Sequence, residues 1–422
     1  MRRLATILLL SVAILLLLGT VMLYSFTTYQ PGLQRLCLHL CWMGVGAVCC
    51  ALASFFSYFW LRKVQAPKWL LGFACMLLVA VWVPGIGAVR NGAYRWLPFG
   101  QPSEFAKLAL IIFLADYAAT HQPRMRERNR GFLRPALIAG LVCALIFVEP
   151  DWGTASLMGA VSLMMLAMGG AHWGYLVSSA VVGCEVFALL LLQNSLRMER
   201  ILAFLDPEKY RNGVGWQGWH ALLSLGSGGL LGTFIGEGAH KNGFVPEQQT
   251  DFVLSLIGEE LGLLGTTLVI VLFVVIVLAG VRIAWRVEDP FGQLLAAGIT
   301  LLIGMQAFIN IGVVTSILPN KGIALPFVSY GGSNLVCMLT GIGLLISVAR
   351  HGPVSRVRLE DQSTPRVGPA VGGPVGSLLD DPEQRNLRGF GKCIARRLRS
   401  RGRSRFPSVP LHSYQRPPRP NP

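Results

Sequence analysis

Acidic side chains gather between residues 243 and 261, just before a long apolar run, in a chain that is otherwise poor in charge. Thr250 could cap a helix that begins here, and Asp251 would then lie in its first turn, where the helix dipole favours an anion. A carboxylate held in this way is a candidate general base. The alternative is that Asp251 serves only as a cap, with Glu259 and Glu260 forming the solvated end of the helix.

A pair of opposite charges lies at Glu104 and Lys107, three residues apart at the start of another apolar segment. On a helix that opens at Pro102 or Ser103, the two side chains share a face and can form an ion pair. An unpaired charge at the centre of a bilayer costs about 2.5–3.5 kcal/mol on insertion scales. We therefore expect the pair to face the interior of a helix bundle, either as a structural pair or as part of a catalytic site.

Three further carboxylates lie between or within apolar segments. Glu149 and Asp151 belong to a tight turn that Pro150 and Gly153 interrupt. We expect Asp151 to cap the next helix, and the two carboxylates either bind a cation or face water. Glu185 stands alone inside an apolar run, which marks either a functional site or a buried group with a partner elsewhere.

The elements that must position these groups are membrane helices. The 422-residue chain is 53% hydrophobic and 14% charged, with a mean hydropathy of +0.54, whereas a soluble domain carries about 25% charged residues. Runs of the roughly 20 apolar residues that a span needs cover 4–34, 36–61, 69–89, 152–184, 261–281, 291–320 and 322–349, with shorter candidates at 103–120 and 135–149. Gly169 and Gly170 divide 152–184 in two. The prediction is an all-α polytopic membrane protein with about ten transmembrane helices.

Basic residues predict the orientation of these helices. With the N-terminus in the cytoplasm, Arg2, Arg3, five arginines within 124–134 and the C-terminal tail all lie inside, as the positive-inside rule requires. Both termini are then cytoplasmic. The arginine cluster is explained by topology and contact with anionic lipid, so no nucleic-acid partner is predicted.

Two segments lie outside the predicted spans. Residues 193–250 form one large extracytoplasmic loop between helices 7 and 8, too rich in tryptophan, leucine and glycine to be disordered. We expect its amphipathic segments to lie at the membrane surface and to admit a lipid headgroup. Residues 351–422 follow the membrane domain, 1–350, as a basic, Pro-rich tail. We expect this tail to be disordered and cytoplasmic, where it either contacts anionic lipid or a partner or is simply solvated.

Irregular backbone is predicted within 317–333, which contains two prolines and three glycines between apolar runs. At a membrane surface such backbone is tolerated only where protein covers it or where it lines a cavity. The glycines of the large loop form no GxGxxG or P-loop pattern, so no nucleotide site is predicted there.

Several of these blocks resemble the SEDS family of bacterial cell-wall polymerases, named for shape, elongation, division and sporulation. The matching blocks are Gln-Pro-Ser-Glu-Phe-Ala-Lys at 101–107, Glu-Pro-Asp-Trp-Gly-Thr at 149–154, Pro-Glu with Thr-Asp-Phe and Gly-Glu-Glu-Leu-Gly within 246–262, and Leu-Pro-Phe-Val-Ser-Tyr-Gly-Gly-Ser at 325–333. The last block, with Pro-Asn-Lys-Gly before it, is more similar to the division branch of the family than to its elongation branch. The resemblance covers everything but the tail.

The resemblance implies a peptidoglycan glycosyltransferase of the bacterial cytoplasmic membrane, active at the division septum. It would polymerise lipid II, the undecaprenyl-diphosphate-linked disaccharide pentapeptide, outside the membrane, with a class B penicillin-binding protein transpeptidase and other division proteins as partners. The family motif places the general base at Asp251. Cationic candidates for the lipid diphosphate are Lys107, Arg200 and Lys241, with a divalent cation, Mg²⁺ or Mn²⁺, as a further candidate.

The same motifs supply supporting positions and show departures from the family pattern. The supporting positions are Glu104, Glu149, Asp151, Gln217, Glu247, Glu260, Lys321, Ser329, Gly331 and Gly332. The departures are at His220, Ala221, Phe234, Glu237, His240 and Gln249, and they bear on the conformation of the large loop.

Three other functions fit part of the pattern. A lipid II flippase would need a charged path across the bilayer, for which only Glu104, Lys107, Asp116 and Glu185 are available. A non-catalytic division scaffold would not need Asp251. An elongation-type polymerase of the same family is the third alternative.

Overall fold

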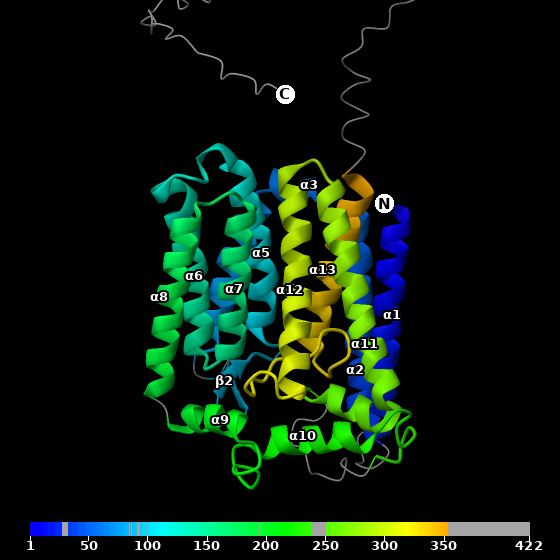
Figure 1. The fold of residues 1–422 in the computed structure, drawn as a ribbon. Coiled ribbons are helices and arrows are strands. Elements are labelled where there is room, and N and C mark those ends of the chain that lie inside the picture. Colours follow the sequence, from blue (N-terminus) through cyan, green and yellow to red (C-terminus); the bar gives the residue numbers. More distant parts are fainter. Residues whose placement is uncertain are drawn as a thin grey trace, which may run out of the picture. The chain divides into compact units, whose positions relative to one another are not determined.

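The computed structural model describes residues 1–27, 33–83, 85, 87–90, 93–98, 100–193, 195–238 and 250–352. Most of this part of the chain is helical (Figure 1). The helices are α1 (Arg2–Thr27), α2 (Leu33–Phe55), α3 (Phe59–Lys63), α4 (Ala66–Ala80), α5 (Pro102–Thr120), α6 (Arg134–Val148), α7 (Trp152–Met168), α8 (Trp173–Leu192), α9 (Ser195–Leu205), α10 (Trp216–Ser227), α11 (Val253–Arg286), α12 (Pro290–Val314) and α13 (Gly332–His351). Two short turns, η1 (Gln122–Arg124) and η2 (Arg128–Leu133), join α5 to α6. The predicted helical membrane fold is confirmed.

A small β-hairpin is an addition that the sequence did not suggest. Strands β1 (Ala88–Arg90) and β2 (Ala93–Trp96) pair in antiparallel fashion after α4. The apolar run predicted at 69–89 therefore ends early, because its last residues turn and enter the hairpin.

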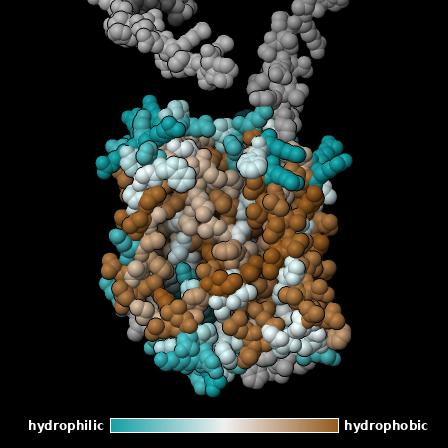
Figure 2. Space-filling model, viewed as in Figure 1, coloured by the Kyte–Doolittle hydropathy of each residue, from teal (hydrophilic) through white to brown (hydrophobic). Residues whose placement is uncertain are grey.

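Seven helices of the described chain are long and apolar enough to cross a membrane: α1, α2, α6 with η2, α8, α11, α12 and α13. Helices α4 and α7 are apolar but shorter, and α5 carries Glu104, Lys107 and Asp116. Figure 2 shows the apolar side chains as a broad band between two hydrophilic ends. These ten helices correspond to the predicted spans, and the number that crosses the bilayer stays a prediction.

The ends of the bundle differ in what they carry (Figure 1). The first residues of α1 and the last residues of α13 lie at the same end, together with α3. Helices α9 and α10 lie across the opposite end of the bundle, transverse to the long helices. This arrangement agrees with a large loop on one side and both ends of the helical domain on the other. The tail from residue 353 lies outside the described residues.

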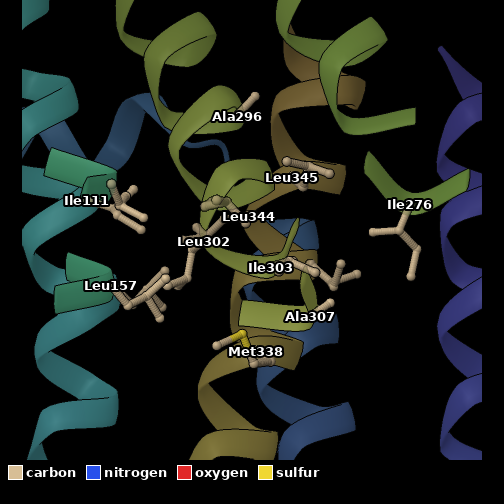
Figure 3. Packing of buried hydrophobic residues seen from close by; sticks show 14 of the residues in the cluster. Ile111, Leu157, Ile276, Ala296, Leu302, Ile303, Ala307, Met338, Leu344 and Leu345 are labelled. Atoms are coloured by element: carbon tan, nitrogen blue, oxygen red, sulfur yellow. The ribbon is translucent and has the colours of Figure 1, made fainter. Parts of the chain in front are cut away.

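The core lies between α5, α7, α11, α12 and α13, whose buried apolar side chains meet in Figure 3. Close approach of the helices depends on small residues, as is usual within membranes. At Gly280 of α11, a methyl group would come within 2.1 Å of the Thr300 hydroxyl of α12. Helix α13 is the most buried of the seven candidate spans, at 72%, whereas α8, at 6%, lies at the edge.

Helix α11 is broken at Gly262, whose φ of +64° is the left-handed conformation that glycine adopts without strain. The segment after α10 fills the break with backbone hydrogen bonds: Leu263 N donates to Gly229 O at 3.0 Å, and Thr233 N donates to Glu259 O at 3.0 Å. Such exchange satisfies groups that the helix break would otherwise leave unpaired. The large loop is thereby fixed to α11 on the side of α9 and α10.

The predicted start of α11 was wrong by two residues. The helix begins at Val253 and its N-cap is Phe252, so Thr250 is not the cap and Asp251 precedes the first turn. The physical reason is tertiary: the Asp251 carbonyl accepts a hydrogen bond from Asn310, and Ser255 N donates to Phe252 O instead.

The orientation of the bundle can be tested by labelling. We expect a cysteine at Lys209, in the large loop, to react with a membrane-impermeant maleimide in intact cells, because the loop should be extracytoplasmic. A cysteine at Arg126 should react only after permeabilisation, with the parent chain as the control for native cysteines. The reverse pattern would place α9 and α10 in the cytoplasm and exclude an external site at Asp251.

Candidate active site

Asp251 lies between the large loop and α11, held by contacts from two other parts of the chain. Asn310 Nδ2 of α12 donates to Asp251 O and to Ile323 O, each at 2.7 Å. The Asp251 carboxylate lies against Gly322, where a methyl group would come within 2.8 Å of Oδ2. Asp251 is half-buried, whereas Glu259 and Glu260 are 1% and 0% exposed. Asp251 is thus the accessible carboxylate of this group.

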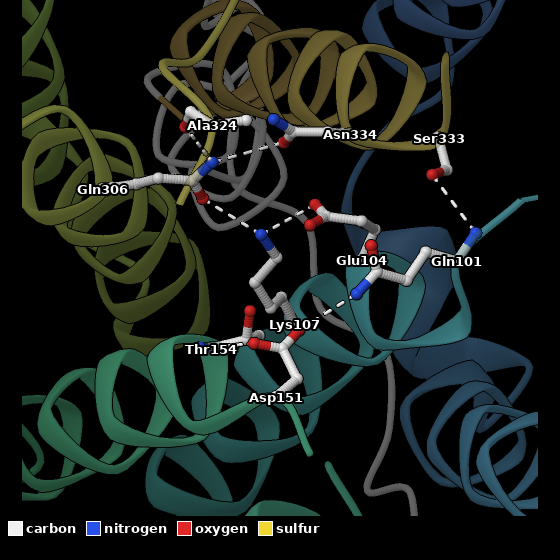
Figure 4. Close-up of polar contacts among 9 residues, drawn as sticks. All are labelled: Gln101, Glu104, Lys107, Asp151, Thr154, Gln306, Ala324, Ser333 and Asn334. Atoms are coloured by element: carbon white, nitrogen blue, oxygen red, sulfur yellow. Dashed lines mark hydrogen bonds and ion pairs between the residues drawn. The ribbon is translucent and has the colours of Figure 1, made fainter. Parts of the chain in front are cut away.

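Glu104 and Lys107 form the predicted ion pair, inside the bundle (Figure 4). Lys107 Nζ lies 2.7 Å from Glu104 Oε2, and the Lys107 side chain is 2% exposed. The ammonium also donates to Gln306 Oε1 at 3.0 Å. Because a buried charge requires both a counter-ion and hydrogen bonds, these contacts are what allow Lys107 to lie here.

Gln306 and Asn310, one turn apart on α12, connect this pair to Asp251 through the backbone of residues 323 and 324. Gln306 Nε2 donates to Ala324 O at 2.9 Å, while Asn310 holds the carbonyls of Ile323 and Asp251. Sequence reasoning did not assign these two amides a role. The sequence feature that could have indicated a role is their spacing. Two amides four residues apart share one face of a mostly apolar helix.

Asp151 is the N-cap of α7, as predicted: its Oδ1 accepts from Thr154 N at 3.1 Å. Its other oxygen, Oδ2, accepts from Gln101 Nε2 at 2.9 Å, and Gln101 N donates to Ser333 Oγ at 3.2 Å (Figure 4). Three of the predicted motif blocks, at residues 101, 151 and 333, therefore meet at one place.

Glu149 is fully buried, so the alternative that it faces water is wrong. Arg95 does not neutralise it, because the guanidinium donates to the carbonyl oxygens of Glu149 and Pro150. Neither carboxylate oxygen of Glu149 has a hydrogen-bond partner within the described residues. Burial, and then the nearby Asp151 carboxylate, raise the pKa of Glu149 to about 8. Glu149 is accordingly a mostly protonated acid at neutral pH.

A raised pKa predicts a pH-dependent stability. The folded protein binds a proton at Glu149 that the unfolded chain releases near its ordinary pKa of 4.5, so stability should fall as pH rises from about 5 through about 8. Glu149→Gln, which mimics the protonated acid, should remove this part of the loss. Thermal unfolding in detergent at pH 5, 7 and 9 measures it, and equal pH profiles for both proteins would show that Glu149 is ionised.

Glu259 and Glu260 do not form a solvated helix end. Glu259 Oε2 accepts from Ser224 Oγ of α10 at 2.7 Å, and the Glu260 carboxylate accepts from Ser25 Oγ of α1 at 2.8 Å. Each glutamate therefore ties the first part of α11 to a different neighbour. Their place in the fold is structural support beneath the loop.

A cleft lies between α9, α10 and the end of α12. Its lining includes Arg200, Gly218, Ser316 and Asn320. Gln217 Oε1 accepts from Asn320 Nδ2 at 3.0 Å, which fixes α10 to the segment that follows α12. Arg200 is exposed at this cleft, well placed to meet a ligand from outside.

The remaining predicted positions have simpler places. Ser329 Oγ accepts from Leu325 N at 2.8 Å and so closes a turn before α13. Gly331 is the N-cap of α13, and Gly332 lies against the Trp42 ring, where a methyl group would come within 2.6 Å. Lys241 and Glu247, like the departures His240 and Gln249, lie outside the described residues.

Two other residues of interest lie on the surface. Glu185 is exposed on α8, so the alternative that it is a buried group is wrong. Phe234, where the family usually has glycine, has a φ of +76° and is 77% exposed. With Leu230, Leu231 and Ile235, also exposed, it forms an apolar patch at the same end of the bundle as α10.

The described residues bring no group of three or more His, Cys, Asp and Glu side chains together in a way that could hold a metal ion. They do not by themselves fit a protein-held divalent site, so we derive no step through an ion.

Comparison with known proteins gives the family. A sequence model of the FtsW/RodA/SpoVE cell-cycle proteins matches residues 3–353. The chain belongs to the FtsW/RodA/SpoVE family. It is 38% identical over 353 residues to a probable peptidoglycan glycosyltransferase FtsW of Geobacter metallireducens, covering 81% of this chain and 93% of that protein. It is 36% identical over 351 residues to the stage V sporulation protein E of Bacillus subtilis, covering 80% and 94%.

A similar chain of known structure agrees with this assignment. That chain belongs to a structure described as the structural coordination of polymerization and crosslinking by a peptidoglycan synthase complex. The TM-score is 0.67 at 27% identity, covering 82% of this chain and 97% of that one. The resemblance to the SEDS family, which is this family, and to its FtsW branch is confirmed.

Proposed function

We propose that this protein polymerises lipid II into glycan strands on the outer face of the cytoplasmic membrane, with Asp251 as the general base. Membership of the FtsW/RodA/SpoVE family makes the chain a peptidoglycan glycosyltransferase of cell division. The observation that carries the proposal is the Asp251 carboxylate, which is half-buried beside Gly322 while its backbone is fixed by Asn310.

The proposed chemistry uses this arrangement. The acceptor hydroxyl gives its proton to the Asp251 carboxylate as its oxygen attacks the anomeric carbon of the donor. The bond from that carbon to the lipid diphosphate breaks, and the diphosphate leaves with the electron pair. A fixed backbone keeps the carboxylate in place, so little orientation must be gained during the reaction.

The other proposed roles are positioning and charge stabilisation. Arg200, exposed at the cleft, and Lys241 are candidates for the diphosphate. Lys107 is already paired with Glu104, so its role is to hold α5, α12 and the 323–324 backbone together. A divalent ion, Mg²⁺ or Mn²⁺, is proposed only as a counter-ion that arrives with the diphosphate, because the described residues form no protein-held metal site.

A penicillin-binding protein transpeptidase is the proposed partner, and the division septum the proposed location. The similar solved chain comes from a complex whose description names both polymerization and crosslinking. Glycan strands must be cross-linked after they are polymerised, so a polymerase with a transpeptidase partner makes physical sense. Other division proteins complete the proposed set of partners.

Purified full-length protein, incubated with fluorescent lipid II, tests the function. We expect a ladder of glycan products on a gel, increased by a class B transpeptidase partner, with Mg²⁺, Mn²⁺ and EDTA as separate arms. A scaffold would give no ladder in any arm. A flippase would move lipid II between leaflets of a vesicle and likewise give no ladder.

A further inference from the structure

Lys321 is a cation without a counter-ion in the described part of the chain. The two salt bridges there are Arg62 with Asp116 and Lys107 with Glu104. Lys321 is half-buried, and its ammonium lies 4.8 Å from the ring centroid of Phe187 in α8. An aromatic face stabilises an ammonium by less than it costs to take that ammonium out of water. Burial accordingly lowers the pKa of Lys321, and a bound anion would offset this cost.

The chain places Lys321 between two features of the candidate site. The residue after it, Gly322, lies against the Asp251 carboxylate. The residue before it, Asn320, lines the cleft that also contains Arg200. The backbone of Lys321 therefore lies between the proposed base and an open cleft, and its side chain extends toward Phe187 of α8.

Two other cations near the candidate site, Lys107 and Arg95, are less suited to an anion. Lys107 is 2% exposed and already bound to Glu104 and Gln306. Arg95 directs its guanidinium to the carbonyl oxygens of Glu149 and Pro150. Both are bound by oxygen atoms of the protein, whereas the Lys321 ammonium has only the Phe187 ring as a partner among the described residues.

We propose that Lys321 binds the diphosphate of the lipid-linked donor and stabilises the charge that develops on it. The inference rests on the proposed function and adds Lys321 to Arg200 and Lys241 as a contact of the diphosphate. As the anomeric carbon–oxygen bond breaks, the electron pair passes to the diphosphate oxygen, while the acceptor proton passes to Asp251. The base and the cation then serve opposite ends of one displacement from neighbouring positions around Gly322.

The test measures binding without turnover, on full-length protein. The probes are undecaprenyl diphosphate in micelles, which carries no sugar to transfer, and inorganic pyrophosphate, which carries no lipid. Lys321→Met should weaken the binding of undecaprenyl diphosphate by about 10- to 100-fold, the usual range for a lost hydrogen bond to a charged group. Lys321→Arg should retain most of the binding. The matched control is Lys209→Met, since Lys209 also lies over an aromatic ring, that of Tyr210 at 5.8 Å, and its binding should change by less than about twofold.

The outcomes show whether the phosphates or the lipid are recognised. They also distinguish failure of the Lys321 site from failure of the proposed polymerase function. If both undecaprenyl diphosphate and pyrophosphate bind in a Lys321-dependent way, the phosphates alone are recognised. If only undecaprenyl diphosphate binds, the lipid is needed as well. Either result supports the site. Unchanged binding by Lys321→Met, or by Lys321→Gln if the first variant does not fold, overturns it, as does a parent protein that binds neither probe. Failure of the parent protein to polymerise lipid II, with Lys321-dependent diphosphate binding intact, would count against the proposed function only.

Discussion

Asp251→Asn should abolish detectable glycan synthesis from lipid II while leaving expression and membrane insertion normal. The amide keeps the size of the carboxylate but cannot take up the proton, and general base catalysis contributes on the order of 10² to 10⁴ in rate. The fold should survive because Asn310 holds the Asp251 backbone carbonyl, which the substitution leaves in place. Initial rates of product formation by the purified variant measure the effect.

Three neighbouring glutamates serve as controls for this variant. Glu→Gln at Glu259 or Glu260 keeps an acceptor for Ser224 or Ser25, so each should cost less activity than Asp251→Asn. Glu247→Gln completes the series. A purified Asp251→Asn protein that polymerises at close to the parent rate would place the base elsewhere.

Single changes in the buried pair Glu104 and Lys107 should have the second largest effect. Glu104→Gln leaves the Lys107 ammonium buried without a counter-ion, and Lys107→Met leaves the carboxylate in the same state. Breaking a buried pair by removing one partner costs about 3–5 kcal/mol. The double variant should lose less stability than the sum of the two single losses, with a coupling energy of about 1–3 kcal/mol. Unfolding in detergent and polymerisation rates measure the cycle.

The chain offers a matched control in its other ion pair. Arg62 Nε lies 2.9 Å from Asp116 Oδ1, but the two side chains are 35% and 22% exposed. A pair this accessible should contribute about 0–1 kcal/mol, so its cycle should show far smaller losses. Equal losses of stability and activity at the two pairs would contradict the role given to the buried pair. So would the absence of a coupling energy between Glu104 and Lys107.

Local physics was enough to predict part of the site. The helices follow from apolar runs of spanning length, the Glu104 and Lys107 pair from its spacing, and the Asp151 cap from its position before a helix. Each of these depends on residues close together in sequence or on the cost of a charge in lipid.

The remaining features depend on contacts between distant segments. The start of α11 was misplaced because Asn310, 59 residues further on, takes the Asp251 carbonyl. Glu259 and Glu260 are buried because the segment after α10 docks into the break at Gly262. No local pattern shows which carbonyl an amide such as Gln306 will meet, so the connection through α12 required the fold.

The central claim is that glycan synthesis occurs on the side of the membrane that carries the large loop. Measuring on which side polymerisation takes place tests it most directly. Proteoliposomes would be made with different fractions of protein oriented loop-outward, counted by impermeant labelling of Lys209→Cys, and fluorescent lipid II would be added only to the outer leaflet. The account predicts that the rate rises in proportion to the loop-outward fraction. A rate that follows the loop-inward fraction, or that does not depend on orientation, would contradict it.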